Sequence, residues 1–163
     1  MKTFFLSLLI VVLFFEGNGQ EPAKMNPREQ ETAKIEIREI VNQIFRSANN
    51  LDLESIFKYY SDTPDFLLVH LDGSLLDYQG AKKVTGETIN ALSFVNYTII
   101  KDEFRFLPNN IIICAWNGKC DMTLKTGENM KIEKIGITFI FKKIDNQWKV
   151  IYSHRSASPR VQL

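Results

Sequence analysis

The chain has 163 residues, of which 45% are hydrophobic and 24% are charged, and its formal net charge at pH 7 is +1. This length and composition predict one globular domain with a substantial hydrophobic core. Because the basic residues form no run, the charge gives no support for a nucleic-acid or membrane-surface role.

Residues 1–19 have the pattern of a secretory signal peptide. A positive charge at Lys2 precedes the apolar run Phe4–Phe15, and small residues follow at Gly17 and Gly19. The run is too short for a membrane-spanning helix, which needs about 20 residues. We therefore expect cleavage near Gly19–Gln20 and a mature protein that is secreted or periplasmic and not held in a membrane.

The two cysteines of the expected mature chain lie on one predicted strand. Cys114 and Cys120 are six residues apart. At about 3.3 Å per residue they would be separated by roughly 20 Å, which is too far for a disulfide bond. We expect two buried thiols and, because no cluster of His, Cys or Asp surrounds them, no metal site.

A long helix is expected near the start of the mature chain. Asn26 followed by Pro27 and Glu29 is typical of a helix N-terminus. Apolar residues then recur at helical spacing until Asn49–Asn50. Residues 20–33 form the lead and the start of this helix, and the main domain is expected over residues 34–158.

The next segment predicts a short helix, a β-hairpin and a third helix. Asp52 can cap the short helix. Phe66–Leu71 and Ser74–Tyr78 are strand-like and flank Asp72-Gly73, a hairpin signal. Gly80–Leu92 has apolar residues at helical spacing.

Four long strands are expected to complete the domain. They are Phe94–Leu107, Ile111–Leu124, Met130–Ile144 and Gln147–Ser156. The short turns between them imply antiparallel neighbours. The fold class is therefore α+β, with three helices covering one face of an antiparallel sheet. Residues 159–163 are expected to be a tail with little that could pack.

Alternation along the strands predicts which side chains face the helices. On the last strand this row is Trp148, Val150, Tyr152 and His154. Arg155 falls on the opposite face, unless a bulge or the strand twist turns it to the rim of a pocket. On the first long strand, Asp102 lies in the same row as Ile100, Phe104 and Phe106.

The opposite face of the sheet keeps more apolar surface than water alone would favour. Its apolar residues are Tyr97, Ile99 and Ile151. We expect a homodimer that pairs across this face.

The order of the elements resembles the nuclear-transport-factor-2-like (NTF2-like) superfamily. Leu51–Asp62 is similar to its second helix and exit, and Asp65–Gly80 to its hairpin and third helix. Asn146–Ser156 is similar to the last strand of SnoaL-like domains and of the association domain of calcium/calmodulin-dependent protein kinases (DUF4440-type). The resemblance covers about Ile35 to Ser158. It implies a cone-shaped α+β fold, with a strongly curved sheet around helices and a pocket between them, in a superfamily of isomerases, cyclases, dehydratases and binding modules.

Two residues are candidates for proton transfer. If its strand face is buried, Asp102 would have a pKa raised by desolvation and could act as a general base. Alternatively, a bulge displaces Asp102 to solvent beside Lys101 and Glu103. His154 could move a proton or bind a ligand, or it could be a core histidine bonded to the backbone.

The candidate ligand-binding residues combine apolar surface with polar tips. They are Tyr60, His70, Tyr78, Trp116, Tyr152, His154 and Arg155. His70 ends the first hairpin strand, where a solvated position is the alternative, and the family resemblance allows Arg155 at the pocket rim. No glycine-rich phosphate loop or nucleophile motif is found, so we expect no cofactor.

These observations favour binding of a small, largely apolar molecule in the pocket, without catalysis. One alternative is a cofactor-free isomerase, cyclase or hydrolase that uses Asp102 or His154 for proton transfer. Another is a protein-interaction module that works through the outer face of the sheet. The expected partners are an unknown small molecule and a second copy of the chain, and no nucleic acid.

Overall fold

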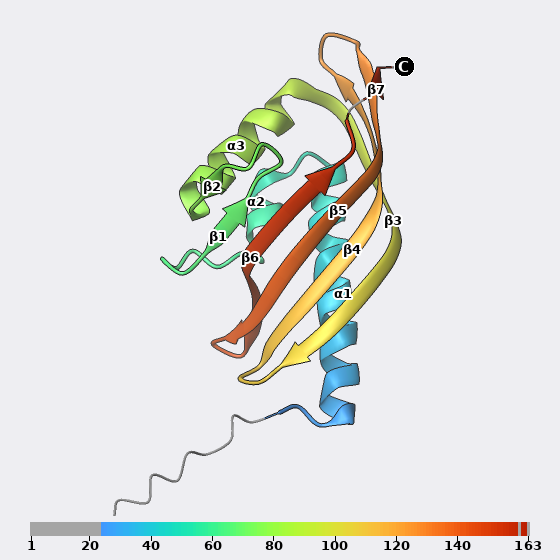
Figure 1. Cartoon of the computed structure of the whole chain (residues 1–163). Helices are drawn as coiled ribbons and strands as arrows, with labels where there is room; N and C mark the ends of the chain where they lie inside the picture. Colours follow the sequence, from blue (N-terminus) through green and yellow to red (C-terminus); the bar gives the residue numbers. More distant parts are fainter. Residues whose placement is uncertain (1–23, 160, 163) are drawn as a thin grey trace, which may run out of the picture.

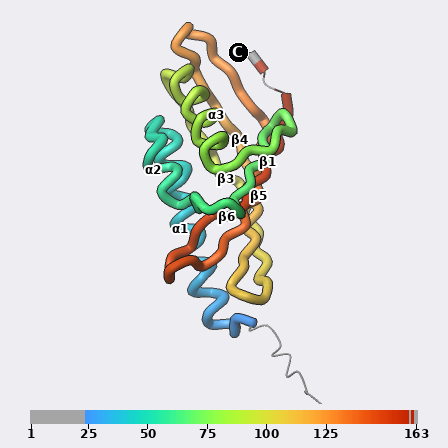
Figure 2. The backbone as a smooth tube through the Cα atoms, turned by 90° about the vertical axis from the view of Figure 1, so that its left-hand side faces the viewer, coloured from blue at the N-terminus to red at the C-terminus, as the bar shows by residue number. Residues whose placement is uncertain are grey.

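The computed structural model describes residues 24–159 and 161–162, so the expected signal peptide lies outside the described residues. In this part of the chain, three helices lie on one face of a single curved sheet (Figure 1 and Figure 2). None of the described helices is both long enough and apolar enough to cross a membrane. The predicted α+β class is confirmed.

Helix α1, Pro27–Asn49, starts at the predicted residues. The Glu29 amide donates to the Asn26 side chain at 2.9 Å, and the Asn26 amide donates back to Glu29 at 2.8 Å. This reciprocal capping satisfies amides that have no partner inside the helix. The buried residues form one stripe along α1, namely Ala33, Ile37, Val41, Ile44 and Phe45. The stripe packs on the sheet, as expected for an amphipathic helix.

Side-chain hydrogen bonds hold α1 against the sheet near its C-terminus and near its middle, in addition to the Arg38–Asp102 pair described below. Near its C-terminus, the Asn49 side chain accepts from the Tyr97 amide at 3.0 Å. Further toward the N-terminus, the Trp148 indole donates to the Glu36 carboxylate at 2.8 Å. The helix is therefore fixed in both position and direction relative to the strands.

Four short elements follow α1. They are α2 (Leu53–Phe57), β1 (Leu67–Val69), β2 (Leu75–Leu76) and α3 (Tyr78–Ala91). Asp52 caps α2 through the Ser55 amide at 3.1 Å, and Asp77 caps α3 through the Gly80 amide at 2.7 Å. These elements match the predicted helix, hairpin and helix.

The main sheet consists of four long strands and short edge pieces. The long strands are β3 (Leu92–Leu107), β4 (Ile111–Leu124), β5 (Asn129–Ile144) and β6 (Gln147–Ala157). The strand order is β2-β1-β6-β5-β4-β3. The four long strands form the predicted antiparallel meander, whereas β1 runs parallel to β6.

The expectation that residues 159–163 form an unpacked tail is partly wrong. Strand β7, Val161–Gln162, pairs with Lys131 and Met130 of β5. Backbone hydrogen bonding to an uncovered part of β5 orders these residues, although they have little side-chain surface to bury.

Four register shifts interrupt the pairing of the long strands, and the first, between Leu92 and Phe94, lies at the start of β3. The second shift in β3 falls between Ile99 and Lys101, and in the β4–β5 pair the shift falls between Gly118 and Cys120. In the β5–β6 pair, Phe141 pairs with Val150 but Ile140 pairs with Tyr152. Such bulges bend a strand and invert its alternation beyond the extra residue.

Gly118 of β4 lies in close contact with the backbone of β3. A Cβ atom at this position would lie 2.0 Å from the Thr98 carbonyl oxygen of the neighbouring strand. No other residue fits there without moving the backbone, because this contact is shorter than any van der Waals distance.

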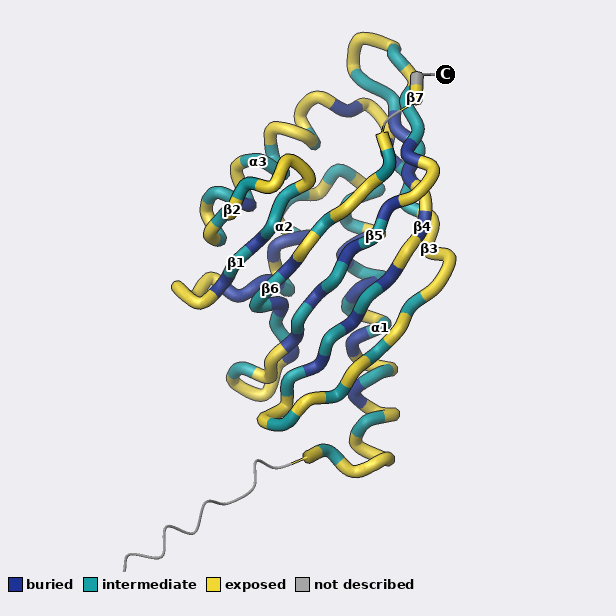
Figure 3. The backbone as a smooth tube through the Cα atoms, viewed as in Figure 1, coloured by how far each residue is buried: buried dark blue, intermediate teal, exposed yellow. Residues whose placement is uncertain are grey.

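The core fills the space between the helices and the middle of the sheet (Figure 3). Phe45 of α1 meets Trp116 of β4 edge to face, with ring centroids 4.4 Å apart. Cys114 and Cys120 are both buried and form no disulfide, as predicted. Burial raises the pKa of the Cys114 thiol to about 12, so this thiol stays protonated.

We expect Gly118→Ala to lower the free energy of unfolding by about 2–3 kcal/mol, because the new methyl group would overlap a backbone carbonyl. Urea denaturation measures this. Gly136→Ala on β5 is the matched control, since its Cβ would lie 3.3 Å from the Ser156 side-chain oxygen and 3.8 Å from the Trp116 carbonyl oxygen, without a severe overlap. Similar stabilities for the two variants would contradict the close contact at Gly118.

Candidate functional site

An interior cavity lies between α1, α3 and the sheet. Its volume is about 130 Å³. Apolar side chains form most of its wall, including Phe45 and Ala48 of α1 and Ile135, Ile137 and Phe139 of β5. The polar residues that line it are Tyr60, His70, Thr85, Thr88, Tyr97 and Arg155. No described aspartate or glutamate lines it. The cavity is therefore apolar with a few polar groups, one of them a cation.

Arg155 of β6 reaches this cavity because of the bulge at Ile151. Beyond the bulge, Arg155 pairs with Ile137, a buried residue on the helix-facing side of β5. Its Nε atom is buried and has no hydrogen-bond partner among the described residues. Plain alternation placed Arg155 on the opposite face, which is wrong. A bulge was one of the two ways in which the sequence analysis allowed Arg155 to reach the pocket, and the structure has a bulge in β6.

The same bulge turns His154 and Tyr152 to the outer face. His154 pairs with Thr138 and is exposed, and Tyr152 pairs with Ile140. The expectation that both share the covered face with Trp148 and Val150 is therefore wrong. The inserted residue inverts the alternation between Val150 and Tyr152. Neither His154 nor Tyr152 lines the cavity.

Two tyrosines line the cavity from opposite sides. Tyr60, which follows α2, is 4% exposed, and burial raises its pKa although the nearby Arg155 guanidinium opposes the change. Tyr97 of β3 pairs with Cys120, and burial raises its pKa to about 12. Both hydroxyls are therefore neutral near pH 7, so each can donate a hydrogen bond.

Sequence reasoning missed three polar residues of the cavity lining, namely Tyr97 on β3 and Thr85 and Thr88 on α3. Alternation counted through Ile100 placed Tyr97 on the outer face, and the bulge in β3 makes that count wrong. No turn or glycine in the sequence marks this bulge.

His70 lies at the rim of the cavity, with 22% of its side chain exposed. Val69 pairs with His154 in the parallel β1–β6 ladder. His70 follows Val69 and Arg155 follows His154, so the two residues come next along neighbouring strands of the same sheet. The His70 Nδ1 atom is 3.2 Å from an Asp72 carboxylate oxygen. Hydrogen bonds from Ser74, and then from His70, lower the pKa of Asp72 to about 2. The hairpin therefore fixes His70 at the cavity rim.

Tyr78 and Trp116 belong to the core and do not line the cavity. The Tyr78 ring packs edge to face on Phe57 and Phe66, with centroids 5.5 and 6.1 Å apart. Trp116 is 3% exposed, and its Nε1 atom has no hydrogen-bond partner among the described residues. Trp116 packs against Phe45 of the cavity wall, whereas the Tyr78 contacts are with core residues that do not line the cavity.

Asp102 forms an ion pair with Arg38 of α1. Two hydrogen bonds of 2.6 and 2.8 Å join the guanidinium to both carboxylate oxygens, and Arg38 also stacks over Phe104. The hydrogen bond with Arg38 lowers the pKa of Asp102. The expectation of a raised pKa is wrong, because the guanidinium outweighs the desolvation. The bulge in β3 does not push Asp102 to solvent either, since it pairs with the buried Trp116 and faces α1. It does not line the cavity.

Residues 34–160 match the model of the family described as "Protein of unknown function (DUF3804)". The chain belongs to the DUF3804 family. Comparison with curated proteins found no match.

Solved structures with the same fold include an NTF2-like superfamily protein from Salmonella enterica subsp. enterica serovar Typhimurium str. LT2, at 17% identity and a TM-score of 0.71, with coverage of 80% of this chain and 94% of that chain. The hexachlorocyclohexane dehydrochlorinase LinA-type3 from Novosphingobium barchaimii LL02 is similar at 10% identity and a TM-score of 0.72, with coverage of 85% and 94%. An NTF2-like protein of unknown function from Pseudomonas putida KT2440 is similar at 15% identity and a TM-score of 0.65, with coverage of 78% and 88%. These similarities confirm the NTF2-like fold of this DUF3804 protein.

We expect Asp102→Asn in this DUF3804 protein to lower the free energy of unfolding by about 1 kcal/mol at pH 7. Because the pKa of Asp102 is depressed in the folded state, its stabilisation is complete above its ordinary pKa of about 4. It is lost as the pH falls through the lower folded-state pKa. Urea denaturation at pH 7 and near pH 3 should show the difference from wild type shrinking.

Asp65→Asn is the control for this measurement, because Asp65 is exposed and forms no ion pair with the described residues. A loss for Asp102→Asn that is the same at both pH values would contradict an electrostatic role of the pair.

Proposed function

We propose that this DUF3804 protein binds a small, largely apolar molecule in the cavity between its helices and sheet. The observation that carries the proposal is the cavity itself, with about 130 Å³ of space inside a well-packed fold. Apolar cavities of about 150 Å³ admit benzene. The ligand is therefore about the size of one aromatic ring or a short branched chain.

The wall of the cavity supports this ligand class. Transfer of apolar surface from water to such a wall contributes about 25 cal/mol per Å². A few convergent polar groups, the hydroxyls of Tyr60 and Tyr97 and the Arg155 guanidinium, can orient the molecule. Apolar walls with a small number of placed polar groups are typical of ligand pockets.

Catalysis by Asp102 or His154 has less support as an alternative. The dehydrochlorinase LinA-type3 has a similar fold, so a cofactor-free reaction is compatible with the architecture. However, the Asp102 carboxylate is held by Arg38, and His154 is exposed on the outer face. Neither residue lines the cavity. The interaction-module alternative, which uses the outer face, leaves the cavity without a role.

Within the NTF2-like superfamily, a specific relationship to SnoaL-like and DUF4440-type domains is a further proposal. Its support is the similarity of Asn146–Ser156 to their last strand. In this protein that segment includes most of β6, which lies between β1 and β5 and supplies Arg155 to the cavity.

We expect Ala48→Leu to weaken binding of a neutral apolar probe such as toluene by about 10-fold or more, because the added carbons occupy the cavity. The rise in melting temperature with increasing toluene measures binding. Ala115→Leu is the matched control, because Ala115 pairs with Thr138 on the outer face. Equal toluene responses of the two variants would contradict binding in the cavity.

Secretion and pairing of two copies are also proposals. Secretion is supported by the N-terminal sequence. Pairing across the outer face is supported by three residues that remain partly exposed there because no described helix covers them. They are Ile113, Ile140 and Tyr152.

We expect native mass spectrometry of the protein from its own cell envelope or medium to show a dimer of chains that begin near Gln20. A signal peptide explains the shortened chain, and apolar contact across the sheet explains the dimer. A chain that keeps residues 1–19 would contradict secretion, and a monomer at micromolar concentration would contradict pairing.

A further inference from the structure

The cavity contains one positive charge, on Arg155, for which the described residues supply no carboxylate partner. Arg155 lines the cavity, and its Nε atom is buried without a hydrogen-bond acceptor. We infer that the natural ligand is a small monocarboxylate whose carboxylate binds the Arg155 guanidinium. This inference rests on the proposed function and names the chemical class of its ligand.

Arg38, Arg46 and Arg105 have carboxylate partners, and Arg28, which has none among the described residues, is exposed to water. Arg38 pairs with Asp102 at 2.6 Å, and Arg105 lies 3.5 Å from Glu103. Arg155, in contrast, forms no ion pair within 4.0 Å with any described residue. Enclosing a charge among apolar side chains is unfavourable unless an opposite charge and hydrogen bonds compensate it. A bound anion would supply both.

The residues around Arg155 supply no negative charge in its place. The Tyr60 and Tyr97 hydroxyls are neutral near pH 7, because burial raises the pKa of each. The nearest hairpin carboxylate, Asp72, is engaged by Ser74 and His70, and 68% of its side chain is exposed. The lining therefore offers an anion one guanidinium and two hydroxyl donors, and no described carboxylate opposes it from the cavity wall.

Charge and size together select a monocarboxylate. A guanidinium matches a planar carboxylate with two parallel hydrogen bonds. One guanidinium balances one negative charge, so the second charge of a phosphate would be left uncompensated in an apolar space. The cavity of about 130 Å³ is slightly smaller than one that admits benzene, so the apolar body of the ligand is at most about one ring in size. Benzoate is thus a suitable probe.

Isothermal titration calorimetry at pH 7 with benzoate, its neutral analogue benzamide and toluene tests the inference. We expect wild-type protein to bind benzoate about 10- to 100-fold more tightly than benzamide, the range that a charge-assisted hydrogen bond provides. Arg155→Met should lose this preference and still bind toluene, which shows that its cavity is intact. Arg155→Lys should keep part of the preference, because lysine retains the charge without the planar fork.

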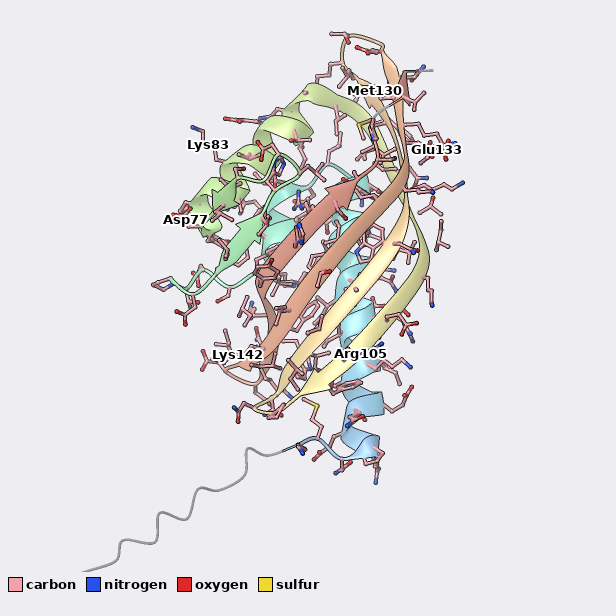
Figure 4. All side chains as sticks on the ribbon, viewed as in Figure 1. Asp77, Lys83, Arg105, Met130, Glu133 and Lys142 are labelled. Atoms are coloured by element: carbon pink, nitrogen blue, oxygen red, sulfur yellow. The ribbon has the colours of Figure 1, made fainter. Side chains whose placement is uncertain are left out.

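Arg105→Met is the matched control, since Arg105 is 71% exposed at the end of β3 that lies away from α3 (Figure 4). It should bind benzoate as wild type does. Equal affinities of wild type for benzoate and benzamide, with toluene bound, would overturn the carboxylate inference and leave the proposed function standing. Failure of wild type to bind either benzoate or toluene would overturn both. Displacement of benzoate by an equal concentration of inorganic phosphate would overturn the selection of a carboxylate.

Discussion

The curvature of the sheet is the constraint on which the rest of this structure depends. A flat sheet of four long strands could not enclose both α1 and a cavity, whereas a sheet bent by bulges can. Gly118 of β4 lies against the Thr98 carbonyl of β3, and the curved sheet brings Tyr97 of β3 and Ile137 of β5 to the same interior space. The hydrogen bond from the Tyr97 amide to Asn49 then fixes the helix inside the curve.

Much of the fold could be predicted from the sequence because its signals are local. The capping residues Asn26 and Glu29, the hairpin at Gly73 and the turns between the long strands all determine backbone geometry within a few residues. The bulges have no such local signal, because their position depends on which strand lies alongside. The faces of His154, Arg155 and Tyr97 were therefore predicted wrongly, whereas the elements that carry them were predicted correctly.

The charged groups illustrate the same limit. Asp102 was placed on the correct strand and given the wrong pKa direction, because Arg38 lies 64 residues earlier in the chain. Sequence reasoning about pKa needs the neighbours in space, which only the packing of α1 on β3 provides. The structure then separates two arginines of opposite character. Arg38 has a carboxylate across the helix–sheet interface, and Arg155 faces a space lined by uncharged side chains apart from His70.

The parallel pairing of β1 with β6 has a consequence for how firmly the cavity lining is held. Strand β1 pairs with β6 only at Leu67, Leu68 and Val69, whereas β3, β4 and β5 are joined along most of their length. A segment joined by few hydrogen bonds separates from its neighbour at a smaller free-energy cost than the strands of the core. The part of the cavity lining that includes His70 and Leu71 is therefore held to the sheet less firmly than the part formed by the long strands.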